Sequence, residues 1–134
     1  MRLFLDANVL FTATHNPDGK AAFILSLGSK GAWKIFSSTF AAEEARRNLS
    51  VKYPSAETKF NKLVASITIV PEHAAAPYPA ELNEKDRPIF QAAYACHATH
   101  LITGDIAHFG ALMNKPGDTF GIIILPPAAF LNSL

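Results

Sequence analysis

The feature that most constrains the fold of this 134-residue chain is an alternation of short apolar runs with helix-like segments. The last run, residues 120–125, carries three consecutive isoleucines with no polar residue between them. Unbroken β-branched runs are typical of strands buried on both faces, and strands that alternate with helices form parallel sheets. The sequence therefore predicts an α/β fold of three layers, with helices covering both faces of a mostly parallel sheet of about five strands.

Turn-forming residues divide the chain into these elements. Ser37, Ser38 or Thr39 is expected to cap the helix over residues 40–52, and Ser55 is expected to cap the next one. Tyr53-Pro54 is expected to end the first of these helices, and residues 71–79, with three prolines, are expected to form a loop. Pro126 and Pro127 are expected to end the last strand. The predicted strands are residues 2–5, 33–36, 67–70, 100–103 and 120–125, and the predicted helices cover about residues 7–14, 21–27, 40–52, 55–66, 86–96 and a short segment to 109.

Length and composition indicate one soluble domain spanning residues 1–134. The twelve basic and eleven acidic residues leave a formal charge of +1, so any nucleic-acid binding must come from a local patch. Cys96 is the only cysteine, and Asp6 interrupts the apolar N-terminal run too early for a signal peptide. We therefore expect a cytoplasmic protein without an internal disulfide or a membrane span.

Four carboxylates are expected at one edge of the predicted sheet. Asp6 follows the first strand and Asp105 follows the fourth, at the carboxyl ends where ligands of open α/β sheets bind. Glu44 lies about two turns into the helix after the second strand, and Asp86 starts the helix that leads to the fourth. Each aspartate also fits a helix N-cap, and the glutamate fits a solvated face. A shared site explains all four positions at once.

Carboxylates gathered in one cleft raise one another's pKa unless a cation neutralises them. Oxygen-only ligands favour Mg²⁺ or Mn²⁺ over zinc. One or two such ions activate water and stabilise the leaving oxygen of a phosphodiester. The sequence thus predicts a Mg²⁺ or Mn²⁺ site.

Several segments, in this order, resemble the PIN-domain nucleases, including the VapC-like toxin ribonucleases. The resemblance covers essentially the whole chain, and the ordered set is more specific than any single motif. The segments are Leu5-Asp6-Ala7-Asn8-Val9-Leu10, Glu43-Glu44-Ala45-Arg46-Arg47-Asn48-Leu49, Asp86-Arg87-Pro88-Ile89, Leu101-Ile102-Thr103-Gly104-Asp105, His108-Phe109-Gly110 and Gly121-Ile122-Ile123-Ile124-Leu125-Pro126.

The resemblance implies a three-layer PIN-like fold and a metal-dependent endoribonuclease. It implies that metal-activated water cleaves RNA, and for a VapC-like toxin it implies an antitoxin bound over the cleft and a homodimer. Many relatives carry another acidic residue where this chain has Ala107, which bears on a second ion. The implied metal and catalytic residues are Asp6, Glu44, Asp86 and Asp105, with Asn8 and Thr103 beside them.

Glu43 competes with Glu44 for the second position of this set. We prefer Glu44 because an apolar residue follows it, as in the family's pattern. His108 lies near the predicted site, where it is expected to serve the turn after the fourth strand or to touch substrate.

A concentration of basic residues suggests an RNA path, with Arg46 and Arg47 as the candidate substrate contacts nearest the acids. A solvated helix face explains the same residues equally well. The five are Arg46, Arg47, Lys52, Lys59 and Lys62.

Two other functions fit parts of the sequence. A phosphatase with a nucleophilic aspartate after the first strand generally needs a second aspartate two residues later, where this chain has Asn8. A catalytically silent module that binds RNA or protein would use the acids only as helix caps, and Ala107 is compatible with it. Metal-dependent stabilisation distinguishes this second alternative from a nuclease.

Overall fold

The computed structural model describes all 134 residues and contains one five-stranded sheet in which every neighbouring pair is parallel. The order of strands across the sheet is β3-β2-β1-β4-β5. This confirms the predicted α/β class and the parallel sheet. The strands are β1 (Arg2–Leu5), β2 (Lys34–Ser38), β3 (Thr68–Val70), β4 (His100–Ile102) and β5 (Ile123–Leu125).

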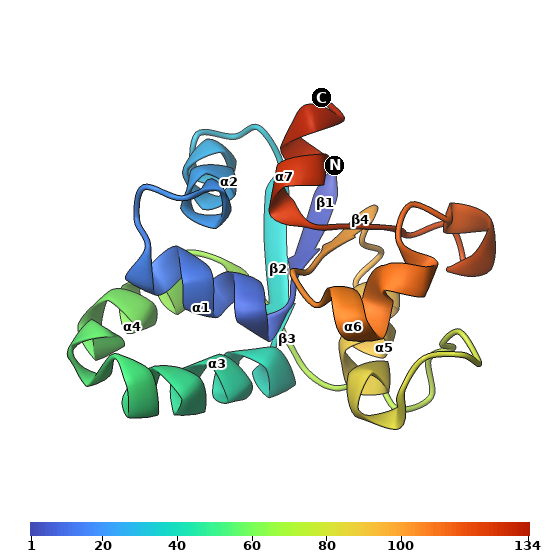
Figure 1. The fold of residues 1–134 in the computed structure, drawn as a ribbon, viewed down its shortest axis with the longest axis horizontal. Helices are drawn as coiled ribbons and strands as arrows, with labels where there is room; N and C mark the ends of the chain where they lie inside the picture. Colours follow the sequence, from blue (N-terminus) through green and yellow to red (C-terminus); the bar gives the residue numbers. More distant parts are fainter.

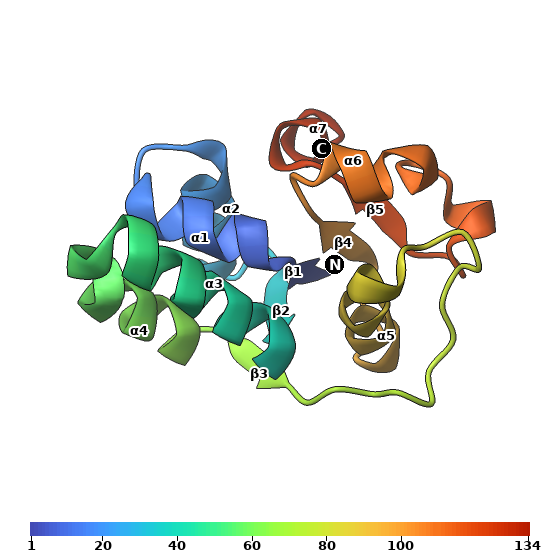
Figure 2. The ribbon, with the colours of Figure 1, turned by 60° about the horizontal axis from the view of Figure 1, so that its bottom comes forward.

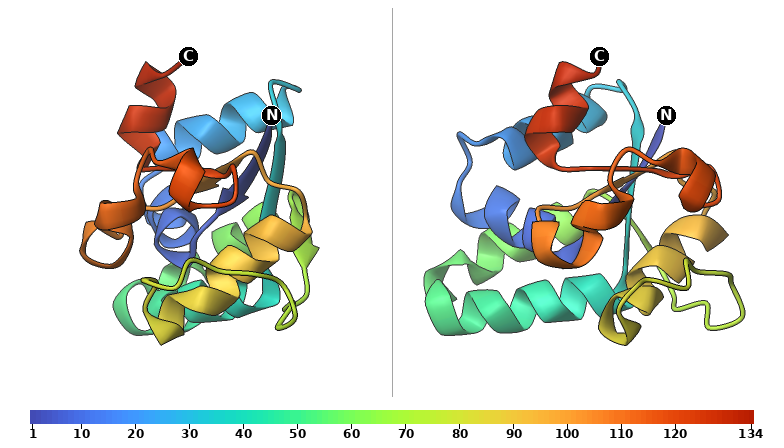
Figure 3. Two further views of the ribbon diagram at one scale, coloured as in Figure 1. Left: turned by 90° about the vertical axis from the view of Figure 1, so that its right-hand side faces the viewer. Right: turned by 45° about the vertical axis from the view of Figure 1, so that its right-hand side comes forward.

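Helices cover both faces of the sheet. Figures 1 and 2 show α1, α3 and α4 together on one side of the sheet and α5 on the other. Figure 3 shows α7 beside α2, with which it packs. The α-helices are α1 (Ala7–His15), α2 (Lys20–Ser29), α3 (Thr39–Lys52), α4 (Glu57–Ala65), α5 (Arg87–Ala95), α6 (Ile106–Phe109) and α7 (Pro127–Asn132), and short 3₁₀ turns span Pro54–Ala56, Glu84–Asp86, Gly110–Leu112 and Pro116–Asp118.

The direction of the chain across the sheet reverses next to β1. From β1 the chain moves to β2 and then β3, whereas the connection through α5 returns to place β4 on the other side of β1. The helices that precede β3 and the helix that follows it lie on opposite faces (Figure 2). Such a reversal opens a crevice at the carboxyl ends of the two strands that flank it. The residues leaving β1 and β4 therefore occupy the position where α/β proteins bind ligands.

The hydrophobic core is centred on β1, the middle strand of the sheet. Leu3, Phe4 and Leu5 are fully buried because β1 has a strand on each side and helices on both faces. All 32 buried apolar residues form a single cluster. No helix combines the length and the apolar character that crossing a bilayer requires.

The predicted last strand is too long, and a helix after it was not predicted. Phe120 and Gly121 have φ values of 53° and 87°, a left-handed conformation that ends strand geometry, so β5 begins only at Ile123. Pro127 starts α7 instead of ending regular structure. Proline lacks only an N–H that the first turn of a helix leaves unpaired, so the Pro-Pro pair marks a helix start here.

Of the two serines predicted to cap helices, one caps a helix and the other does not. Ser38 caps α3, because its hydroxyl accepts a hydrogen bond from the Ala41 N–H at 3.1 Å. Ser55 caps nothing: Pro54 opens a 3₁₀ turn, and α4 follows from Glu57. The prediction placed a helix correctly there but misjudged the residue that starts it.

Candidate active site

Asp6 leaves the carboxyl end of β1 and caps α1 from a buried position, with 5% of its surface exposed. Its Oδ1 accepts the Ala7 N–H at 2.7 Å. Its Oδ2 accepts the Thr103 hydroxyl at 2.7 Å and the Asn8 side-chain amide at 3.1 Å. We call Asp6, Asn8 and Thr103 the Asp6 network; in it both oxygens of the carboxylate have donors.

Thr103 and Asn8 join the loop after β4 to the start of α1. The Thr103 oxygen also accepts the Asp105 N–H at 3.1 Å, and Asn8 Oδ1 accepts the Gly104 N–H at 2.7 Å. Thr103 is fully buried and its hydroxyl donates to Asp6, and its predicted contact with substrate stays a prediction. Asn8 is half-buried beside the site, and its predicted contact with substrate stays a prediction.

Burial raises the pKa of Asp6 from its ordinary value of 3.8 to about 6. The hydrogen bonds from Thr103 and Ala7 act in the opposite direction, because they stabilise the ionised form. The negative charges of Glu44 and Asp86 raise the pKa of Asp6 further. These charges therefore act on Asp6 across the same crevice.

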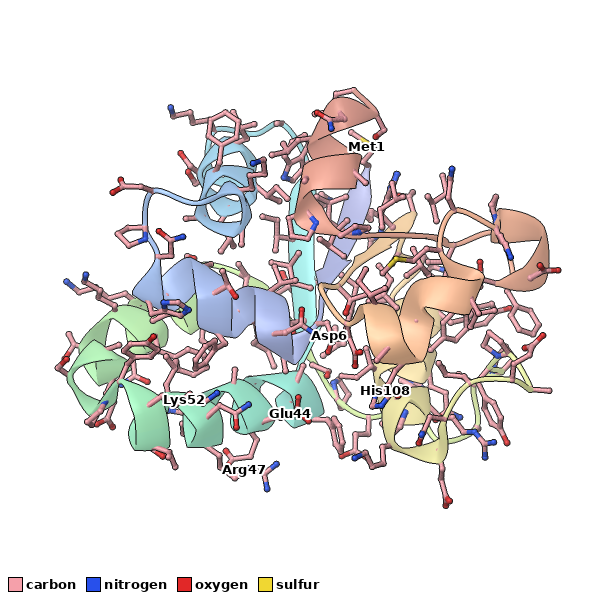
Figure 4. The ribbon with its side chains drawn as sticks, in the orientation of Figure 1. Met1, Asp6, Glu44, Arg47, Lys52 and His108 are labelled. Carbon is pink, nitrogen blue, oxygen red and sulfur yellow. The ribbon has the colours of Figure 1, made fainter.

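A second group lies beside the Asp6 network, where the 3₁₀ turn before α5 meets the start of α6. Nδ1 of His108 is 3.0 Å from Oδ2 of Asp86 and 3.0 Å from Oδ2 of Asp105. Asp105 caps α6, since its Oδ1 accepts the His108 N–H at 3.0 Å. We call Asp86, Asp105 and His108 the His108 cluster. In the view of Figure 4 the labelled Asp6, Glu44 and His108 lie in the same region, at the carboxyl end of β1, on α3 and on α6.

Asp86 differs from the other two aspartates because its side chain caps no helix. Its Oδ2 atom is inaccessible to solvent, and it meets no hydrogen-bond donor other than Nδ1 of His108, which lies 3.0 Å away. Burial raises the pKa of Asp86, the His108 charge lowers it, and the Asp105 charge raises it again. Helix capping therefore explains the positions of Asp6 and Asp105 but not the position of Asp86.

The structure separates the two adjacent glutamates of α3. Glu44 is half-buried and its charge acts on Asp6, whereas the Glu43 side chain is 60% exposed and lies 3.7 Å from the Arg46 guanidinium. The preference for Glu44 over Glu43 thus agrees with the geometry. The helix α3 also packs against α5, which brings the second acidic position toward the third.

The two candidate substrate-binding arginines turn away from the acids. Arg46 donates to the Asn61 side chain at 3.1 Å and lies 5.1 Å from the centre of the Phe60 ring, so it joins α3 to α4. Arg47 is exposed and points outward from α3 (Figure 4). Both line a pocket of about 220 Å³ with Tyr53. Neither contacts the carboxylates, so their role in binding RNA stays a prediction.

A surface cavity of about 970 Å³ lies away from all four carboxylates. It is lined by residues at the amino-terminal ends of the strands, including Arg2, Lys34 and Thr68. Charge and hydrogen bonding, not cavity size, mark the acidic crevice as the candidate site.

His108 is the site residue that sequence reasoning left without a defined role. Its position three residues after Asp105, at the end of a one-turn helix, was the available signal, because side chains at that spacing share a face. Its contact with Asp86, more than twenty residues earlier in the chain, depends on how α5 and α6 meet. Sequence spacing alone does not give that contact.

Comparison with known proteins shows the fold. No family model and no curated protein matches the sequence. Among solved structures, a chain of VapBC2 from Rickettsia felis, in a crystal structure bound to a DNA fragment from the promoter, has a TM-score of 0.65 at 20% identity, covering 92% of this chain and 97% of that one.

Two further structures agree. A chain of FitAB bound to the IR36 DNA fragment has a TM-score of 0.60 at 17% identity, covering 93% of this chain and 94% of the other. A chain of VapBC-1 from nontypeable Haemophilus influenzae has a TM-score of 0.59 at 13% identity, covering 96% and 99%. At these identities the likeness establishes architecture. The chain has a VapC-like PIN-domain fold, so the resemblance stated from the sequence is confirmed at the level of the fold.

Proposed function

We propose that this chain is a divalent-metal-dependent endoribonuclease that hydrolyses RNA phosphodiester bonds and acts as the toxin of a toxin-antitoxin pair. The observation that carries the proposal is the group of Asp86, Asp105 and His108 at the crevice between β1 and β4, where Oδ2 of Asp86 is inaccessible to solvent and meets no donor other than the His108 ring nitrogen. Carboxylates gathered away from water cost free energy unless a cation compensates their charge. The VapC-like fold adds support, since nuclease activity accompanies that fold in the family the sequence resembles.

The residues present fit a Mg²⁺ or Mn²⁺ ion. Carboxylate oxygens are the ligands that these ions prefer, and Mg²⁺ is usually held by few of them. In this proposal Asp6, Glu44, Asp86 and Asp105 hold the ion. When bound, the ion supplies positive charge for the attacking water and the scissile phosphate. Ala107 offers no ligand where many relatives have another acid, so we propose one ion.

The chain's own residues prepare this chemistry by fixing the carboxylates before substrate arrives. The Thr103 hydroxyl and the Asn8 amide hold Asp6 in one orientation. The Asp105 side chain is fixed by its cap on α6. Pre-oriented charged groups avoid reorganisation during the reaction, which is a large part of enzymatic rate enhancement.

RNA and a second protein are the proposed partners. The half-buried Asn8 at the crevice and the exposed Arg47 on α3 are the proposed contacts to RNA. The matching structures are of VapBC and FitAB assemblies, which supports an antitoxin partner. We further propose a homodimer of single-domain subunits, residues 1–134, in the cytoplasm.

The experiment is a cleavage assay on several RNAs with Mg²⁺, with Mn²⁺ and with chelator. Wild type, Asp6→Asn and Asp86→Asn are compared with Glu84→Gln, a control that removes an exposed negative charge two residues from Asp86. We expect metal-dependent cleavage by wild type and the control, and a loss of about 100-fold or more in both aspartate variants. A folded wild type that cuts none of the RNAs with either ion would favour the silent binding module.

A further inference from the structure

The ring nitrogen Nδ1 of His108 lies between one carboxylate oxygen of Asp86 and one of Asp105. The other contacts of these two side chains leave both oxygens free to bind a ligand. The Oδ1 atom of Asp105 accepts the His108 N–H, so its Oδ2 is the atom facing Nδ1 at 3.0 Å. The Oδ2 atom of Asp86, also 3.0 Å from Nδ1, has no other polar partner. One nitrogen and two oxygens from three residues therefore converge on one point.

The spacing of these atoms matches the edges of a coordination octahedron. Octahedral ions with bonds of about 2.1 Å place adjacent ligand atoms about 3.0 Å apart. Both nitrogen-to-oxygen distances in the His108 cluster are 3.0 Å, and potential ligand atoms of the three residues all lie within 4.8 Å of one another. The separations of the three side-chain atoms therefore fit adjacent positions around one ion.

We propose that Nδ1 of His108 is a metal ligand together with Asp86 and Asp105, so that the site prefers Mn²⁺ and later divalent transition metals to Mg²⁺. The inference rests on the proposed metal-dependent nuclease and deepens it. Imidazole nitrogen suits transition metals, whereas Mg²⁺ takes oxygen ligands almost exclusively. An imidazole in place of one oxygen therefore adds affinity for Mn²⁺ and adds little for Mg²⁺.

If His108 is not a metal ligand, removing its ring should change metal affinity in the opposite direction. If the ring served only as a cation that pairs with Asp86 and Asp105, it would compete with any metal for their charge. Removing the ring would then strengthen binding of Mg²⁺ and Mn²⁺ together. A ligand role predicts that removing the ring weakens Mn²⁺ binding selectively.

The test measures Mn²⁺ bound to purified protein by electron paramagnetic resonance, and Mg²⁺ affinity by competition against it. His108→Asn is compared with wild type and with His73→Asn, a control that removes an exposed loop histidine. We expect a nitrogen hyperfine coupling from directly bound imidazole in pulsed spectra of wild type and the control, and none in His108→Asn. We expect Mn²⁺ affinity to fall about tenfold or more in His108→Asn while Mg²⁺ affinity changes less than about threefold.

The following results would contradict the proposal that His108 binds the metal. Bound Mn²⁺ without nitrogen coupling in wild type, or equal changes for both ions in His108→Asn, would overturn the ligand role and leave the carboxylate site of the proposed function standing. A wild type that binds no Mn²⁺ at all would overturn both proposals.

Discussion

The Asp6 network and the His108 cluster lie next to each other at the same edge of the sheet, but their polar atoms are satisfied differently. In the Asp6 network every carboxylate oxygen has a donor, and Thr103 bridges Asp6 to the Asp105 backbone. In the His108 cluster one oxygen of Asp86 is inaccessible to solvent and meets no donor other than the His108 ring nitrogen. Satisfied networks fix a geometry, whereas an unsatisfied buried charge costs stability unless a ligand compensates it. The first group therefore positions the site, and the second is the part that a cation completes.

The largest expected effect concerns the pH dependence of stability that the buried carboxylate of Asp6 creates in the metal-free protein. Its pKa is raised from 3.8 to about 6, so the folded state holds the proton more tightly than the unfolded state. The associated stability is present below about pH 4 and is lost as pH rises to about 6, an effect of about 3 kcal/mol.

Urea unfolding in chelator, at pH 4 and pH 7, measures this effect as the difference between wild type and Asp6→Asn. Relative to Asp6→Asn, wild type should lose about 3 kcal/mol of unfolding free energy as pH rises. A difference that stays constant with pH would mean that Asp6 ionises in the fold as easily as in the unfolded chain.

The next effect separates the two glutamates of α3. Glu44→Gln should lower RNA cleavage by about 100-fold, because Glu44 acts on Asp6 across the crevice. Glu43→Gln is the matched control and should stay within about twofold of wild type, because its side chain is exposed. A larger loss of cleavage in Glu43→Gln than in Glu44→Gln would assign the second acidic position to Glu43.

A smaller effect tests whether the Asp6 network is structural. Thr103→Val removes a buried hydroxyl that donates to Asp6 and accepts from Asp105 and Asn8, and should destabilise the fold by about 2 kcal/mol. Thr14→Val is the control, because that buried hydroxyl makes one bond, to the Leu10 carbonyl, and should cost less than about 1 kcal/mol. Equal unfolding free energies in urea for the two variants would show that the network does not hold the site together.

The smallest effect concerns the arginines outside both groups. Arg47→Ala should weaken RNA binding by about threefold at low salt, with a smaller loss at higher salt, because an exposed arginine contacts phosphate through screened charge. Arg46→Ala serves as the comparison, since Arg46 is held by Asn61 and Phe60. Fluorescence anisotropy at two salt concentrations measures both, and an Arg46 effect larger than the Arg47 effect would reverse the assignment.

The sequence predicted the elements that depend on local pattern. The strand at Arg2–Leu5 was exact, and Ser38 caps α3 as expected. The errors, in the last strand and the helix after it, fall where the same local sequence is compatible with two structures. Residues 120–122 are apolar, but the backbone of Phe120 and Gly121 is left-handed. A Pro-Pro pair starts a helix as readily as it ends a strand.

The candidate site was predictable in part for the same reason. Asp6 and Asp105 follow strands whose carboxyl ends a parallel sheet must bring together, so sequence order placed them. Whether the Thr103 hydroxyl is buried, and whether Asp86 finds a donor, depend on packing between α1, α5 and α6. The role of His108 also depends on that packing, because its partner Asp86 lies on another element.

The most direct test of the central claim is urea unfolding of wild type and Asp86→Asn, each with Mn²⁺ and with chelator. A cation site predicts that wild type gains about 2.7 kcal/mol at an ion concentration 100 times its Kd, and that the variant gains almost nothing there. A wild type that gains no stability from Mn²⁺, or a variant that gains as much, would contradict the assignment of this crevice as a metal site.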